Sequence, residues 1–305
     1  MIPYTNKPKH FIRSASKSIA SFLKEKEEQQ FADDQTIDSF GEEWQRFHQF
    51  EAAELERIGE EYFDVVNEAM LNKDSRVLDI GCGSGRWSKY VSSRAGFVEA
   101  IDPSEAVLVA AELLKEAENV RVTQAGIDEI PFADGSFDFA FCLGVLHHLP
   151  NTAEALKKCV DKVKPNGYFL TYLYYSLDNR GATYRLIFKA SNLLRQVVSR
   201  LPFALKAVVC DVLAVALYMP FVGLGRVLSK IPIVKRLVPM LPLSYYCDKS
   251  FYIIRNDALD RFGTPLEKRY SQAEIQMMME AAGLEDIRFS EKAPFWHGVG
   301  RKKGI

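Results

Sequence analysis

The residues with the clearest chemical potential form one glycine-rich segment, VLDIGCGSGRW, which runs from Val77 to Trp87. An apolar run that contains Asp79 is followed by three glycines at alternate positions, Gly81, Gly83 and Gly85. Glycine lets the backbone turn sharply and approach a ligand without a clash at Cβ. Because the apolar run is typical of a short buried strand, the segment predicts a ligand-binding turn at the carboxyl end of that strand.

The spacing of the glycines separates the classes of nucleotide ligand. The NAD fingerprint G-x-G-x-x-G needs a glycine where this chain has Arg86. The Gly-Lys-Ser/Thr of a phosphate-gripping loop is also missing. We therefore expect a turn that holds a nucleoside without cradling a pyrophosphate.

Asp102 is the second acid with a candidate role, since it ends the next predicted strand, 21 residues after Gly81. A carboxylate there can accept hydrogen bonds from both hydroxyls of a ribose. The alternative is that Asp102 caps the following helix through Pro103 and Ser104.

Short apolar segments alternate with helical segments along the middle of the chain, a pattern typical of βαβ units and a parallel sheet. We therefore predict an α/β fold, a doubly wound Rossmann-like and mostly parallel sheet. A further helix begins with the capping box of Ser271 and Glu274 and ends at Gly283. Two strand segments close the sheet within 287–303. The five earlier strands are expected at 76–80, 97–104, 120–125, 137–145 and 167–176, and the intervening helices at 87–93, 104–117 and 152–163.

Four parts are expected along the 305 residues. They are a helical N-terminal cover (1–71), a nucleoside-binding core (72–176), a basic and apolar helical insert that acts as a lid (177–252), and a completion of the core (253–305). Residues 1 to about 35 are peripheral, as a basic amphipathic helix or a loose polar arm, and helices follow from Phe40 to near Leu71. The longest uncharged run of the insert, Val212 to Gly225, contains Pro220 and is shorter than the ~20 residues that span a bilayer.

Charge is distributed unevenly. The chain has a formal net charge of -1, which argues against a general nucleic-acid binder. Residues 181–247, however, carry nine lysines and arginines and a single acid, Asp211. This segment predicts peripheral contact with an anionic membrane or a lipid-linked phosphate or sugar, or else a solvated face of a packed insert.

Cysteine usage and the N-terminus bear on the compartment. The five cysteines are scattered without CxxC pairs, which is typical of reduced thiols in a cytoplasmic protein, and they suggest no metal site. The first ten residues lack the apolar run of a secretory signal. We expect a cytoplasmic location with possible membrane association, and the oligomeric state stays open.

Three motifs in order carry a resemblance to a known family. VLDIGCGSGRW, AIDPS and DEIPFADGSFDFAFCLGVLHHL resemble the class I S-adenosylmethionine-dependent methyltransferases of the small-molecule type, over about 40–176 and 250–302. FGEEWQRF resembles the segment that closes over the methionine end in many relatives, although core packing explains Trp44 equally well. The acid that the family places before its adenine-facing residue aligns with Gly126, so Asp128 takes that contact or the contact is missing. The resemblance implies these cofactor-binding residues: Trp44, Asp79, Gly81, Cys82, Gly83, Asp102, Pro103, Ile127, Asp128, Leu143 and Gly144.

The family's cofactor carries an electrophilic methyl group, so the protein has to align the acceptor and exclude water. An oxygen acceptor also has to lose a proton, for which His147 and His148 are candidates, although either histidine can instead cap or pack. Tyr172 and Tyr174, on one face of their strand, and Arg261 and Arg269 are candidate substrate contacts.

The expected activity is methyl transfer to a small or lipid- or sugar-linked acceptor, most readily at oxygen. One alternative is carbon methylation of a prenylated quinone-type ring. A second alternative is a non-catalytic partner that binds S-adenosylmethionine, supported by Gly126 alone. An NAD-dependent oxidoreductase is disfavoured by Arg86.

Overall fold

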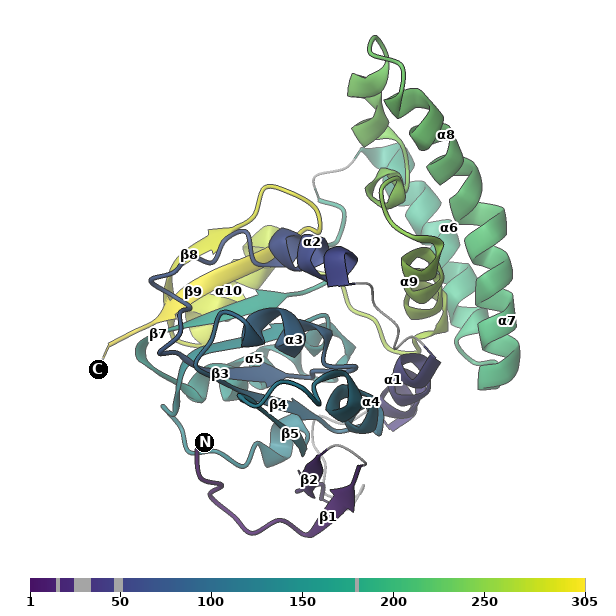
Figure 1. Cartoon of the computed structure of the whole chain (residues 1–305). Helices are drawn as coiled ribbons and strands as arrows, with labels where there is room; N and C mark the ends of the chain where they lie inside the picture. Colours follow the sequence, from purple (N-terminus) through teal and green to yellow (C-terminus); the bar gives the residue numbers. More distant parts are fainter. Residues whose placement is uncertain (15–16, 25–33, 47–51, 179–180, 305) are drawn as a thin grey trace. The chain divides into compact units, whose positions relative to one another are not determined.

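The computed structural model describes residues 1–14, 17–24, 34–46, 52–178 and 181–304. It divides into two compact units (Figure 1): unit 1 comprises Met1–Asp178 and Leu266–Ile305, and unit 2 comprises Asn179–Pro265. Unit 2 is therefore longer than the insert expected at 177–252. The difference is the helix α9 (Phe251–Gly263), which packs with helices of the insert instead of completing the core.

Unit 1 is built on a nine-stranded sheet within the described residues, in the order β1-β2-β5-β4-β3-β6-β7-β9-β8. The strands from β2 to β7 run parallel, and β1, β9 and β8 are antiparallel to their neighbours. The strands are β1 His10–Arg13, β2 Ser18–Ser21, β3 Arg76–Ile80, β4 Phe97–Asp102, β5 Val120–Gln124, β6 Phe137–Leu143, β7 Val163–Tyr172, β8 Leu284–Phe289 and β9 His297–Lys302. The predicted α/β class and mostly parallel sheet are confirmed.

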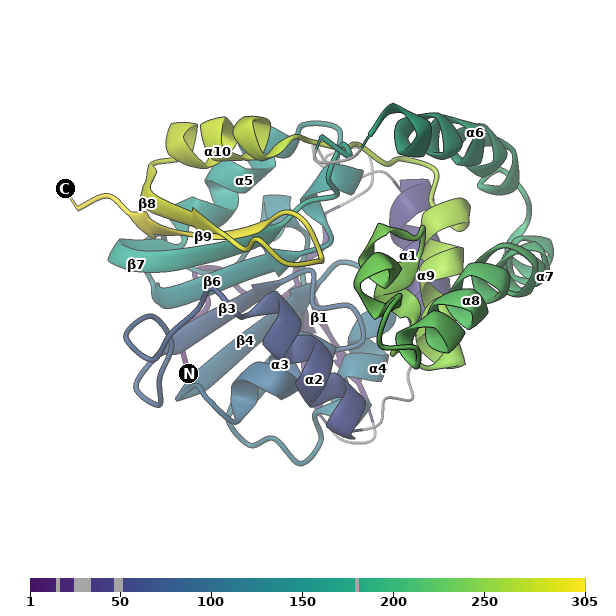
Figure 2. The same ribbon diagram turned by 90° about the horizontal axis from the view of Figure 1, so that it is seen from above.

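Helices cover both faces of the sheet, with α3 and α4 on one face and α5 and α10 on the other (Figure 2). The apolar side chains between these layers form the core, and five phenylalanines are among its largest fully buried members. The order of strands reverses at β3, because the chain goes first outward to β4 and β5 and then back to β6 on the other side. Ligands of doubly wound sheets bind at such a switch point. The helices of unit 1 are α1 Asp34–Arg46, α2 Ala52–Tyr62, α3 Arg86–Ser92, α4 Ala106–Leu113, α5 Thr152–Asp161 and α10 Gln272–Ala281, with short 3₁₀ turns η2 Ile127–Glu129 and η3 Leu146–His148.

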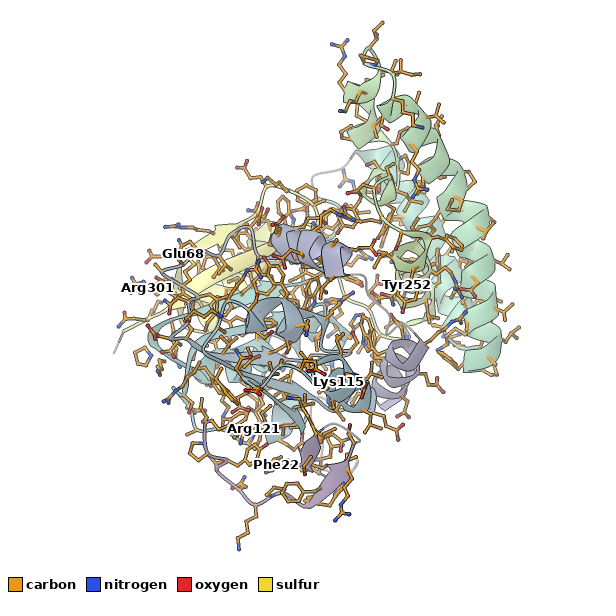
Figure 3. The ribbon with its side chains drawn as sticks, in the orientation of Figure 1. Phe22, Glu68, Lys115, Arg121, Tyr252 and Arg301 are labelled. Atoms are coloured by element: carbon orange, nitrogen blue, oxygen red, sulfur yellow. The ribbon has the colours of Figure 1, made fainter. Side chains whose placement is uncertain are left out.

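The first 24 residues extend the sheet, so the expected terminal helix or loose polar arm is wrong for the described residues. β2 pairs with the edge of β5, and β1 pairs with β2. Ile19 and Phe22 are buried, while Arg121 of β5 pairs with Glu99 and donates to the carbonyl of Ile2. Figure 3 labels Phe22 and Arg121 at this edge. Strands of four residues are set by tertiary pairing rather than by local pattern, so the sequence alone indicates them poorly.

The C-terminal helix α10 confirms its predicted capping box, whereas the N-terminal helices end earlier than predicted. The Ser271 hydroxyl accepts from the Glu274 amide and the Glu274 carboxylate accepts from the Ser271 amide, as the capping box predicts. The N-terminal helices do not continue to Leu71, because α2 ends at Tyr62 and turns follow. The acidic run at 25–28 and residues 47–51 lie outside the described residues.

Unit 2 is helical, as the sequence predicts, and α9 packs against its longer helices α6 and α7. The guanidinium of Arg255 on α9 makes two bonds to the carboxylate of Asp211, at 2.9 and 2.8 Å. The hydroxyl of Tyr218 donates to Asp257 of the same helix at 2.7 Å. Asp211 of α7 and Tyr218 of η4 thus both bond to side chains of α9. Besides α9, the elements are α6 Ala182–Val198, α7 Phe203–Leu213, the π-helical turn η4 Ala214–Tyr218, α8 Met219–Ser229, and the 3₁₀ turns η5 Lys235–Met240 and η6 Ser244–Tyr246.

The segments α7, η4 and α8 form one continuous helix, Phe203–Ser229. Among the described residues it has the length (27 residues) and the mean hydropathy (2.1) that a membrane-crossing helix needs, and 28% of its most apolar window is buried. The expectation that this segment is too short to span a bilayer is therefore wrong by length and composition. Pro220 lies in the first turn of α8, directly after the π-helical turn, where a missing N–H is tolerated, so the helix continues.

Candidate functional site

Two glycine turns lie at the carboxyl ends of the neighbouring strands β3 and β6. Gly83 has a φ of 51°, in the left-handed region, and a Cβ built there would lie 2.8 Å from Nε1 of Trp44. Gly144 has a φ of 78°, and a Cβ there would meet nothing within 4 Å. The hydroxyl of Ser84 is buried without a hydrogen-bond partner among the described residues. This edge of the sheet therefore offers close backbone approach and a polar group ready for a ligand.

Asp102 ends β4 and is held by the loops on both sides. Its Oδ2 accepts from the Gly83 amide at 2.9 Å. Its Oδ1 accepts from the Ser104 amide at 2.9 Å and from the Ser104 hydroxyl at 2.6 Å, and that hydroxyl accepts from the amide of Ala106. The capping alternative thus describes part of what Asp102 does. A carboxylate has about four lone-pair positions, so Asp102 keeps acceptor capacity for a ligand hydroxyl.

Asp79, in β3, is almost completely buried, at 1% exposure, and accepts from the hydroxyl of Ser88 at 2.6 Å. Burial raises the pKa of Asp79 to about 7, and the negative charge of Asp102 acts in the same direction. Burial also raises the pKa of Asp102, against the hydrogen bonds from Ser104 and Gly83. Two neighbouring buried acids make an anionic site, which favours a cationic ligand and disfavours a pyrophosphate.

Helix α1 brings Trp44 to the glycine turn. The half-buried indole lies against Gly83, and the guanidinium of Arg86 lies 4.8 Å from the centroid of Trp44 and 4.6 Å from that of Trp87. A cation between two indoles is a stabilising arrangement. Trp44 therefore lies against the glycine turn and is only partly buried.

The turn after β5 contains the position where the family's acid is replaced by Gly126. The carboxylate of Asp128 accepts from Nζ of Lys158 on α5 at 2.9 Å, and its side chain is 6% exposed. Asp128 is thus engaged with α5, and Ile127 beside it is half-buried.

The carboxylate of Glu129 folds back onto Gly126. Its Oε2 accepts from the Gly126 amide at 3.2 Å and lies 2.7 Å from where a Cβ of Gly126 would be. Its Oε1 accepts from the amide of Lys24 at 3.3 Å. The sequence analysis missed this acid, whose one signal is a glutamate three residues after Gly126, the spacing at which its carboxylate can bond back to the Gly126 amide.

His147 and His148 are buried side by side after β6, with ring centroids 4.0 Å apart. The Nδ1 of His148 lies 2.6 Å from the carbonyl oxygen of Leu266. Since a carbonyl oxygen can only accept, Nδ1 carries the proton and Nε2 keeps its lone pair. Burial lowers the pKa of His147 well below 6.5, with the charges of His148 and Arg269 adding to the effect, so its ring is neutral. Its two nitrogens have no hydrogen-bond partner among the described residues.

Aromatic side chains and Arg269 surround the histidines. Tyr174 stacks on His147 at 3.9 Å between ring centroids, and Tyr172 lies 5.7 Å from Tyr174. The guanidinium of Arg269 lies 5.0 Å from the centroid of Tyr174 and pairs with Glu267 at 2.7 Å. The structure therefore brings five predicted residues into one cluster, and the charge of Arg269 is already paired with Glu267.

Other predicted positions divide between the two units. Arg261 belongs to unit 2, where it bonds to Ser191 at 2.9 Å and lies over Phe188 at 4.1 Å. Tyr175 points the other way from Tyr174, toward Phe295, as strand alternation predicts. The remaining predicted positions in the glycine turns and the turn after β4 are Gly81, Cys82, Pro103 and Leu143.

Comparisons with known proteins agree with this geometry. Residues 78–171 match the family described as a methyltransferase domain. The ubiquinone biosynthesis O-methyltransferase of Dechloromonas aromatica is 33% identical over 141 residues, 45% of this chain and 61% of that protein. The protein of the same name from Pseudomonas aeruginosa is 38% identical over 95 residues, 30% of this chain and 41% of that protein. The chain thus spans about half the length of such curated relatives.

Among solved structures, human N-acetylserotonin methyltransferase in complex with S-adenosylmethionine has a TM-score of 0.49 and 15% identity, over 87% of this chain and 57% of that one. The family match falls on the segment that carries β3 to β7, with its glycine turns and buried acids. Residues 78–171 therefore form a methyltransferase domain of the class I S-adenosylmethionine-dependent type.

Proposed function

We propose that the protein transfers a methyl group from S-adenosylmethionine to an oxygen atom of a small, apolar or lipid-linked acceptor. The observation that carries the proposal is the anionic site at the glycine turn. Asp79 and Asp102 are buried together there, beside backbone that can approach a ligand closely. S-adenosylmethionine is cationic at its sulfonium and its ammonium group, so it matches the charge of the site, whereas NAD does not.

The residues present fit this cofactor. We assign the ribose hydroxyls to Asp102, the ammonium end to Asp79 and the Gly81–Gly83 turn, and the cover to Trp44 on α1. Glu129 takes the place of the acid that Gly126 lacks, with Ile127 beside it. When bound, the cofactor supplies a methyl carbon that its sulfonium makes electrophilic. The protein holds that carbon near Leu143 and Gly144, at the turn that leads to the histidines.

His148 is the proposed base. Its Nε2 takes the proton of the acceptor hydroxyl while the oxygen forms its bond to the methyl carbon, and the electron pair of the broken carbon–sulfur bond goes to sulfur. The bond from Nδ1 to Leu266 orients the ring and stabilises the imidazolium that results. His147 stays neutral because its pKa is lowered, so it adds no positive charge that would oppose protonation of His148.

The acceptor class follows from the surroundings of the histidines and from the relatives. Tyr172 and Tyr174 make the surroundings of the histidines aromatic, which suits an apolar or aromatic acceptor. The matched relatives are named as O-methyltransferases of ubiquinone biosynthesis, which favours an oxygen acceptor over the carbon alternative. The five cysteine thiols are free, which supports the proposed cytoplasmic location. The proposed peripheral membrane contact of residues 181–247 fits an acceptor that resides in lipid.

A labelled-methyl assay tests the activity. The full chain is incubated with methyl-labelled S-adenosylmethionine and an alkyl-substituted catechol, and label is measured in the organic extract and located by NMR. We expect label on oxygen. Label on a ring carbon would favour the carbon alternative. Tight binding of S-adenosylhomocysteine without transfer to phenolic, quinol or lipid-linked sugar acceptors would favour the non-catalytic partner.

Cofactor binding is expected to depend on pH through Asp79. The carboxyl has a pKa of about 7 in the free protein and is partly protonated below that value, whereas a cationic ligand needs it ionised. The affinity for S-adenosylhomocysteine should therefore rise as pH rises toward 7, by up to about tenfold per pH unit, and then level off. Titration calorimetry between about pH 5.5 and about pH 8.5 measures this, with proton release visible in buffers of different ionisation enthalpy.

Ionisation of Asp79 favours cofactor binding but lowers the stability of the free protein. Its pKa in the fold lies above the ordinary value of 3.8, so ionisation destabilises the folded state as pH rises through the interval up to about 7. Asp79→Asn should therefore raise the melting temperature of the free protein at about pH 8 and weaken cofactor binding. Asp138→Asn, at the other end of the strands, is the control. An affinity in Asp79→Asn equal to that of the wild type at every pH would contradict the assignment.

Loss of the Glu129 carboxylate is expected to have a smaller effect on cofactor binding. Glu129→Ala should weaken binding of S-adenosylhomocysteine about tenfold, because it removes an acid fixed over the turn by two backbone amides. Glu116→Ala, on the exposed end of the same βα segment, should bind like the wild type. Equal affinities of the two variants would show that the family's acid has no replacement here.

A further inference from the structure

The long helix Phe203–Ser229 of unit 2 exposes apolar side chains where a surface helix of a protein in water exposes charged ones. Its exposed large side chains are all apolar, with exposures from 40% for Leu217 to 59% for Val208 and Val227. They are Leu205, Val208, Val212, Val215, Leu217, Phe221, Leu224 and Val227. A helix on the surface of a protein in water carries its charged residues on this outer face.

The three charged residues of the same helix are all engaged inside unit 2. Lys206 is buried against Gly263, Asp211 is paired with Arg255, and Arg226 donates to the backbone carbonyls of Cys247 and Lys249. The helix is thus polar toward the protein and apolar toward the outside. This arrangement is expected of a surface whose surroundings are hydrocarbon rather than water.

The apolar surface continues beyond the helix and has a basic border. Of the 21 exposed large apolar side chains among the described residues, 16 lie between Leu186 and Met240. Exposed basic residues flank the helix at its two ends: Arg200 before it, and Lys230, Lys235 and Arg236 after it. Only one acid occurs in 181–247, and it is Asp211, which is already paired. An apolar face with a basic border complements an anionic bilayer.

We infer that unit 2 is a monotopic membrane module, in which the outer face of Phe203–Ser229 lies in the headgroup and acyl boundary of an anionic bilayer. The basic residues at its ends reach the lipid phosphates. This inference specifies the peripheral membrane contact proposed above, and it does not depend on the methyl-transfer activity, because it rests on the surface of unit 2 alone.

Two other occupants fit the observations less well. A helix that crossed the bilayer would carry α9 with it, because Asp211 and Tyr218 are bonded to Arg255 and Asp257 of that helix, and would place those charges in hydrocarbon. A second copy of the chain would bring one strongly basic segment against another. An anionic lipid surface satisfies both the apolar face and its charged border.

Vesicle flotation of the full chain tests the inference. Wild type should float with vesicles of phosphatidylcholine and phosphatidylglycerol and less with phosphatidylcholine alone. The double variant Val212→Glu, Leu224→Glu should lose at least about tenfold in partitioning, since charge on the lipid face is costly. The triple variant Lys230→Glu, Lys235→Glu, Arg236→Glu should lose about 100-fold on anionic vesicles. Met277→Glu, at an equally exposed apolar position on α10, should float like the wild type.

Two further measurements report the depth of the helix in the bilayer and the folding of the variants. In Phe221→Trp, the new tryptophan should be quenched by brominated acyl chains, and unchanged binding of S-adenosylhomocysteine should show that unit 1 of each variant is folded. Flotation that is equal for wild type and the double variant would overturn the inference. So would a dimer in solution that the double variant converts to a monomer, because the face would then bind a second copy.

Discussion

Binding of S-adenosylhomocysteine is expected to fall on the order of 100-fold, about 3 kcal/mol, when Asp102 is replaced by alanine. The change removes a buried carboxylate that accepts from Gly83 on one side and from Ser104 on the other. Both the proposed ribose contact and the position of the glycine turn depend on that group. Titration calorimetry on wild type and variant, run beside NAD, measures the difference.

A milder variant separates the two contributions of Asp102. Asp102→Asn keeps one acceptor oxygen and most of the packing, so it should bind better than the alanine variant and worse than wild type. Asp134→Ala, which removes an exposed acid paired with Lys162, is the control for net charge. If Asp102→Ala binds S-adenosylhomocysteine as tightly as the wild type, or if NAD competes for the site, the cofactor assignment is wrong.

The turnover number should fall by about 100-fold to 10,000-fold in His148→Gln, while the affinity for S-adenosylhomocysteine stays within a factor of about two. Glutamine retains size and hydrogen bonding but cannot take a proton from the acceptor. The expected split between rate and binding comes from the placement of His148, whose contacts include Leu266, His147, Tyr174 and Phe40. Single-turnover methyl transfer to the catechol probe gives the rate.

The neighbouring histidine provides the comparison. His147→Gln should reduce the rate less, since the two nitrogens of that ring are buried and its role is to pack between His148 and Tyr174. A catechol that is already ionised at high pH should restore much of the rate to His148→Gln. Full activity of the double variant at neutral pH would rule out base catalysis by either ring.

The central strands could be predicted from the sequence because their signals are local. RVLDI is apolar and bounded by turn residues, and β3 occupies those five residues. The capping box of Ser271 was accessible for the same reason, and so were two closing strands, although β8 begins at Leu284, before the expected range of 287–303. Strands such as β2 were not, because Ser18–Ser21 has no pattern of its own and becomes a strand by pairing with β5.

The site residues, like the strands, divide into those with a local sequence signal and those that only the fold brings together. Glycine spacing and the acids after two strands are visible in the sequence, so Asp79, Gly83 and Asp102 could be chosen without coordinates. The bond from His148 to Leu266 joins residues far apart in the chain, and only the fold brings them together. The outer face of the long helix was obscured by counting charges along the chain, since Asp211 and Arg226 face inward.

One consequence concerns communication between the two units. Leu266, whose carbonyl fixes the tautomer of His148, is the first residue of unit 1 after unit 2 ends at Pro265. The next residues continue along the site, because the amide of Lys268 donates to the carbonyl of His147 and Arg269 lies over Tyr174. The peptide bond between Pro265 and Leu266 therefore joins unit 2 directly to the residue whose carbonyl orients the proposed base.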